Sequence, residues 1–134
     1  MRTHIRIRES FCAALALKDP KLSEEENLRH FGRWTETHGH DFTLEVVVAG
    51  RVNPRTHCIM DYSALHRRVR RAIIAEVDHK YLNDVEMLRG LTPTAENMAR
   101  VFFRRLSQEL PRGVHLVKLT LEDGAGNATI VESD

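Results

Sequence analysis

The segment from His38 to Gly50, HGHDFTLEVVVAG, constrains the fold more than any other part of the chain. Its even-numbered residues from Phe42 to Val48 are all apolar, and a period of two is typical of a strand that buries one face. Val47 is apolar as well, so the middle of the strand is apolar on both faces. We therefore expect a sheet with helices on one face and a partner subunit against the other.

The remaining segments predict the order ββααββ. The expected elements are a strand at 4–16, helices at 63–77 and 94–110, and a hairpin of strands at 114–121 and 128–132. The polar stretch from Lys18 to Arg33 is expected to be a long loop, because Asp19-Pro20 is a turn signal. The chain is thus predicted to be one α+β domain over residues 1–134, with a four-stranded antiparallel sheet and two helices on one face.

Composition and charge exclude several classes of protein. The formal net charge is +1, which gives no overall field to attract nucleic acid or a membrane surface. No apolar run is long enough to span a membrane, and the first residues lack a secretory signal, so a cytoplasmic location is expected. The basic run from His66 to Arg71 has no aromatic residues interleaved, which favours a solvated helix face and makes nucleic-acid binding unlikely.

Two pairs of residues suggest chemistry. His38 and His40 are two apart on a strand, so both imidazoles point to one side and could supply two of the three protein ligands of a catalytic zinc. They could equally be two polar residues at the mouth of a strand. Asp78 and His79 end the first helix, where the carboxylate could orient the imidazole for proton transfer. A histidine that merely offsets the helix dipole would look the same.

Three further residues could hold a polar ligand. Thr94 and Glu96 start the second helix, where free backbone N–H groups are available, although an N-cap and a first-turn carboxylate have the same sequence pattern. Glu122 ends the third strand and could accept two hydrogen bonds from the N–C–N edge of a heterocycle. An ordinary strand-end charge is the alternative for Glu122.

Taken in order, these segments resemble the 6-pyruvoyltetrahydropterin synthases and the related 6-carboxytetrahydropterin synthases of queuosine biosynthesis. Six short motifs carry the resemblance, in family order: Phe11-Cys12-Ala13-Ala14, His38-Gly39-His40-Asp41-Phe42, Ile59-Met60-Asp61-Tyr62, Val77-Asp78-His79-Lys80-Tyr81-Leu82-Asn83, Pro93-Thr94-Ala95-Glu96-Asn97 and Leu121-Glu122-Asp123.

The resemblance implies a tunnelling fold, in which three subunits join their sheets into a barrel and two such rings stack into a hexamer with pockets at subunit interfaces. It also implies three zinc-binding histidines, a cysteine that acts with an Asp–His pair, and a glutamate that anchors a pterin. Carried over, the matching positions are His38 and His40 for metal, Asp78 and His79 for proton transfer, and Thr94, Glu96 and Glu122 for the pterin.

Two positions depart from the family pattern. Leu15 stands where the third zinc-binding histidine is expected, and Trp34 stands where the nucleophilic cysteine is expected. Neither Cys12 nor Cys58 is placed to replace that cysteine. We therefore expect His38 and His40 to be a vestige of the metal site, with no cofactor bound.

Three hypotheses follow. The first is a binder of a pterin-like heterocycle, or a metal-free enzyme in which Glu36 acts as base. The second is an active lyase, a 6-pyruvoyl- or 6-carboxytetrahydropterin synthase, in which another residue such as His57 completes the zinc site. The third is a structural or nucleic-acid-binding oligomer that uses the face from Arg67 to Arg71.

Overall fold

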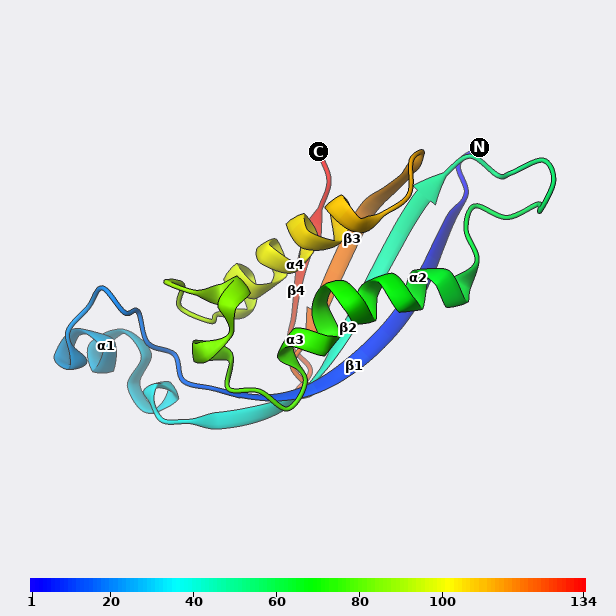
Figure 1. Cartoon of the computed structure of the whole chain (residues 1–134). Helices are drawn as coiled ribbons and strands as arrows, with labels where there is room; N and C mark the ends of the chain where they lie inside the picture. The colour runs from blue at the N-terminus through cyan, green and yellow to red at the C-terminus, as the bar shows by residue number, and fades with distance from the viewer.

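The computed structural model describes residues 1–134 and contains one antiparallel sheet in the order β1-β2-β3-β4 (Figure 1). The strands are β1 (His4–Leu15), β2 (His38–Gly50), β3 (Val114–Glu122) and β4 (Ala128–Glu132). In the register between the first two, Phe11 pairs with Phe42 and Leu15 pairs with His38. The expected four-stranded α+β fold is confirmed.

The two long helices cover one face of this sheet (Figure 1). The first consists of α2 (Tyr62–Val69), a π-helical segment (Arg70–Ile74) and α3 (Ala75–Val77), and the second is α4 (Ala95–Glu109). Short 3-10 helices at Leu82–Asp84 and Glu86–Leu88 connect them. A core of 24 buried residues fills the space between helices and sheet. Burial of this apolar face is the main term that holds the layers together.

The segment expected to be a loop is partly helical, so that prediction was wrong. Helix α1 (Glu24–Phe31) is followed by a 3-10 helix at Gly32–Thr35. Ser23 and Glu26 form a capping box, and three glutamates in the first turn favour the positive end of the helix dipole. The helix lies beyond one end of the sheet (Figure 1). It buries little apolar surface there, which is why its sequence lacks the periodicity that marks a helix.

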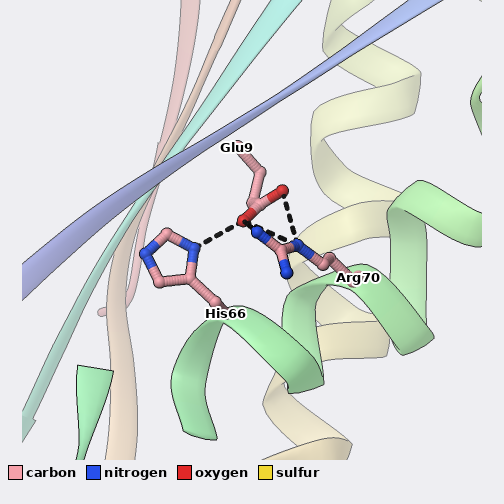
Figure 2. A network of polar contacts seen from close by, with 3 residues as sticks. All are labelled: Glu9, His66 and Arg70. Carbon is pink, nitrogen blue, oxygen red and sulfur yellow. Dashed lines mark hydrogen bonds and ion pairs between the residues drawn. The ribbon is translucent and has the colours of Figure 1, made fainter. Parts of the chain in front are cut away.

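A polar contact joins the first long helix to the edge strand (Figure 2). The Glu9 carboxylate accepts hydrogen bonds from His66 Nδ1 at 2.5 Å and from Arg70 Nε at 3.0 Å. The Glu9 side chain is only 10% exposed, and a carboxylate with so little access to water needs such partners. Arg70 is therefore occupied by an internal partner.

The other face of the sheet carries no helix (Figure 1). Ile130 is 53% exposed, and Val47 of β2 points to this same side, opposite the buried Val46 and Val48. No helix of the protein has the length and apolar character to cross a membrane.

Candidate functional site

A cavity of about 410 Å³ lies where β1 ends, β2 begins and α4 begins. Its wall is half apolar, and it is formed by Leu15, Leu17, Trp34, His38, His40, Phe42, Pro93, Thr94, Ala95, Glu96, Met98, Asp123, Ala125 and Asn127. Apolar walls with a few convergent polar groups are typical of small-molecule sites.

The two histidines of β2 point into this cavity side by side. Their ring centroids are 5.2 Å apart. His38 Nδ1 lies 2.8 Å from the carbonyl oxygen of Glu36, which can only accept, so Nδ1 carries the proton. In the neutral imidazole, the Nε2 atom of His38 is then an acceptor. It can serve either a metal or an N–H group of a ligand.

The donors around these histidines do not fit a three-ligand zinc site. Leu15 pairs with His38 across the strands, is 4% exposed and has no donor atom. No group of three His, Cys, Asp or Glu side chains in the chain is placed to hold a metal ion. His57, the suggested replacement, lies in the loop that follows the opposite end of β2, hydrogen-bonded to Asn53. Within one chain His57 therefore cannot complete the site.

Trp34 occupies the wall beside His38, with 5.2 Å between the two ring centroids. The row of rings continues from His38 through His40 to Phe42, with the last two centroids 5.4 Å apart. The Arg33 guanidinium lies 4.7 Å from the Trp34 ring centroid, a cation–π contact. From the sequence, Trp34 was notable only because it stands where the family's cysteine is expected. The aromatic wall it helps to form becomes visible only in the structure.

The start of α4 supplies the polar side of the cavity. The Thr94 hydroxyl accepts a hydrogen bond from the Asn97 backbone N–H at 3.2 Å, so Thr94 is the N-cap and also lines the cavity. Glu96 lines it as well and has no ion-pair partner. The geometry is thus compatible both with a helix N-cap followed by a first-turn carboxylate and with a site that holds a polar ligand.

The hairpin loop between β3 and β4 forms a wall that sequence reasoning missed. Asp123 accepts hydrogen bonds from Ala125 N at 2.8 Å and from Asn127 Nδ2 at 3.0 Å. The Asn127 side chain, the Ala125 amide and, more weakly, His40 hold the pKa of Asp123 below its ordinary value. Gly124 has φ +81°, and a Cβ there would lie 2.8 Å from the Asp41 carbonyl oxygen. The sequence DGAGN indicated only a turn, whereas the close approach to β2 brings Asp123 and Asn127 to the cavity.

Glu122 does not line this cavity. It is exposed and follows the buried Leu121, so its side chain lies on the helix-free face of the sheet. It pairs with Thr43 and Ala128 through the backbone. Within one chain, the structure therefore separates Glu122 from Thr94 and Glu96.

Asp78 and His79 lie together at the outer edge of β1. Asp78 Oδ1 is 3.0 Å from His79 Nδ1, and it accepts the backbone N–H of Cys12 at 3.0 Å. The Cys12 amide, followed by His79, holds the pKa of Asp78 below its ordinary value against the opposing effect of desolvation. His79 has φ +60° and its side chain is 81% exposed. The pair is outside the first cavity, and His79 lines a second one of about 610 Å³.

Glu36 and the two cysteines are not gathered at the cavity either. Glu36 is exposed, and its backbone carbonyl rather than its carboxylate contacts His38. Cys12 and Cys58 are both free and exposed. A hydrogen bond to Asp41, together with desolvation and Asp78, raises the pKa of the Cys12 thiol, which disfavours the reactive thiolate.

The basic helix face is partly neutralised. Arg68 donates to the Glu109 carbonyl oxygen, and Arg71 lies 3.5 Å from the Glu109 carboxylate. With Arg70 paired to Glu9, only Arg67 of this run of arginines has no internal partner. These pairings support the interpretation of a solvated helix face.

Comparison with known proteins gives one consistent family. The family model described as 6-pyruvoyl tetrahydropterin synthase matches residues 4–134. The chain is 33% identical over 130 residues to the 6-pyruvoyl tetrahydrobiopterin synthase of Homo sapiens, a match that covers 95% of this chain and 89% of that protein. It is 35% identical over 124 residues to the dihydroneopterin monophosphate aldolase of Pyrococcus furiosus, covering 92% of each. The solved 6-pyruvoyl tetrahydropterin synthase of Caenorhabditis elegans has a TM-score of 0.90 and 28% identity, covering 100% of this chain and 97% of that one.

Proposed function

The chain belongs to the 6-pyruvoyl tetrahydropterin synthase family, and from this premise we propose that it binds a pterin-like heterocycle without carrying out the zinc-dependent synthase reaction. One observation carries the proposal. The cavity is present with its two histidines and its polar helix start, while Leu15 and Trp34 stand in it where the family pattern expects a zinc ligand and a nucleophile.

The cavity matches the chemistry of a pterin ring. Its volume of about 410 Å³ is at the small end of the range for bound small molecules, which suits a bicyclic ligand. A pterin presents an N–H/NH2 edge, for which the Glu96 carboxylate and the His38 Nε2 atom are acceptors. The names of two relatives, a 6-pyruvoyl tetrahydrobiopterin synthase and a dihydroneopterin monophosphate aldolase, point to the same ligand class.

Glu122 enters this proposal through a second subunit. Its side chain lies on the helix-free face, outside the cavity of its own chain, so it could contact the heterocycle only by reaching the cavity of a neighbouring subunit. We propose a homo-hexamer built as a dimer of trimers, whose subunits join their sheets into a barrel. The exposed Ile130 and the half-buried Val47 on the uncovered face support an assembly that covers them.

The alternative is an active pterin synthase-type lyase, a 6-pyruvoyl- or 6-carboxytetrahydropterin synthase, with a rearranged metal or acid–base site. The Asp78–His79 contact at 3.0 Å favours it, because the carboxylate holds the imidazole in one orientation. Glu36 as base would require its exposed carboxylate to turn toward the ligand. Turnover of a dihydroneopterin phosphate ester by the purified protein would establish this alternative.

Calorimetric titration of neopterin tests the binding proposal. A charged hydrogen bond is worth about 1.5–3 kcal/mol, so Glu96→Gln and Glu122→Gln should each weaken binding by about tenfold or more. His79→Ala should change the affinity little while abolishing any residual turnover. Glu86→Gln is a matched control, since Glu86 is exposed and lies outside the cavity. Failure of the wild-type protein to bind any pterin would overturn the proposal.

A further inference from the structure

We propose that Trp34 is the stacking surface of this cavity and makes it select a planar, fully conjugated pterin over a reduced one. The inference rests on the proposed function, because it specifies which oxidation state of the ring is bound. The family pattern expects a nucleophile, and not an aromatic ring, at this position.

The indole is placed where a ring could stack. It lines the cavity next to His38, and its plane is tilted by 58° from that imidazole, so the two rings are not stacked on each other. Trp34 is 44% exposed although it borders a cavity. A large apolar ring with that much free surface gains from being covered by a ligand.

The surroundings hold the indole in place. The Arg33 guanidinium lies over the ring, 4.7 Å from its centroid. The backbone of Trp34 is also fixed, because its carbonyl oxygen accepts the Leu17 N–H at 2.8 Å. Because these two contacts restrain Trp34, it loses little conformational freedom when a ligand binds.

The oxidation state of the pterin ring then affects how tightly the ligand stacks on Trp34. A fully conjugated pterin is flat and presents its whole π face to the indole. A tetrahydropterin has saturated carbons in one ring, which pucker and lose part of the contact and of the π interaction. Aromatic pairs contribute beyond simple burial to an extent that corresponds to about three- to tenfold in affinity.

The test compares three oxidation states of one ligand. Neopterin, 7,8-dihydroneopterin and tetrahydroneopterin are titrated under anaerobic conditions by calorimetry. Trp34 is the only tryptophan in the chain, so quenching of its emission also reports contact at this cavity. We expect neopterin to bind about three- to tenfold more tightly than the tetrahydro form and to quench the emission.

Variants separate stacking from mere bulk. Trp34→Leu keeps an apolar side chain but removes the π face, so the preference for neopterin should disappear, whereas Trp34→Phe should keep most of it. Phe31→Ala controls for damage to α1 and the 3-10 helix that follows it, because Phe31 is an aromatic residue of α1 that lies outside the cavity.

The outcomes are distinguishable. If none of the three ligands binds, the proposed function itself fails. If they bind with equal affinity, or if Trp34→Leu retains the preference, the role of Trp34 is refuted while pterin binding stands. If binding leaves the emission of Trp34 unchanged, the ligand is elsewhere and the inference is likewise overturned.

Discussion

Leu15 lies opposite His38 on the neighbouring strand, at a point where an imidazole would give the cavity a third nitrogen ligand. Leucine instead adds to the apolar wall and is 4% exposed. The side chain at position 15 thus decides whether this end of the cavity offers a metal ion three imidazole nitrogens or only the two of His38 and His40.

Leu15→His should therefore raise the affinity for zinc by about tenfold or more, because three imidazoles hold the ion far better than two. Competition against a chromophoric chelator measures this on protein purified without an affinity tag. Leu17→His is the control, since Leu17 also lines the cavity but lies beyond the paired part of β1. Stoichiometric zinc in the wild-type protein would contradict the prediction, as would an unchanged affinity in Leu15→His.

Asp78 should make stability depend on pH. Its pKa is depressed in the folded protein, chiefly by the Cys12 amide, so its contribution is present above the unfolded pKa and is lost as the pH falls through the folded pKa. Asp78→Asn should be less stable than wild type at pH 7, and the difference in the free energy of unfolding should begin to narrow below about pH 4. Urea unfolding at pH 7, 5 and 3 measures this difference. Asp84→Asn, at an exposed position, is the control and should be as stable as the wild type. A stability difference between Asp78→Asn and the wild type that does not change with pH would contradict the prediction.

At the scale of elements, α1 and the first long helix differ in what holds them. Both have a side-chain N-cap, Ser23 for α1 and Asp61 for α2. Only α2 buries apolar residues against the sheet, whereas the one buried residue of α1 is the polar Asn27. The Ser23 cap should therefore stabilise α1 alone. The Asp61 cap should stabilise the whole fold, because α2 is packed into the core.

Ser23→Ala should cost α1 about 1 kcal/mol, which corresponds to roughly fivefold faster hydrogen exchange of its amides. The midpoint of global unfolding should hardly move. Asp61→Ala should instead lower that midpoint, because α2 is part of the core. Equal shifts in the midpoint for both variants would show that α1 unfolds only with the rest of the molecule.

The whole molecule has one sheet face under helices and one without them (Figure 1). It also has two edge strands, of which β1 is partly covered where Ala14 bridges to Tyr81. Uncovered edges and faces are where sheets associate, so the shape favours assembly of several copies.

Val47→Asp should dissociate that assembly, because it places a charge at the middle of the uncovered face. Light scattering at micromolar concentration should show a hexamer for the wild type and smaller species for the variant. Arg100→Asp, on the exposed side of α4, is the control and should leave the mass unchanged. A monomeric wild-type protein would refute the proposed assembly.

The sequence alone determined the strands, the two long helices and their order, because each buries a face with the period of its own backbone. The placement of His38 and His40 side by side on one face of the strand also followed from the period of two. These are local properties, and they could be predicted because the apolar pattern is strong.

The tertiary structure decided what shares a cavity. The turn at Gly124 brings Asp123 and Asn127 beside His40. Trp34 lines the same cavity from the 3-10 helix at Gly32–Thr35, in a segment that the sequence predicted to be a loop. Such neighbours depend on strand register and loop packing between residues far apart in the chain, and no local period records them.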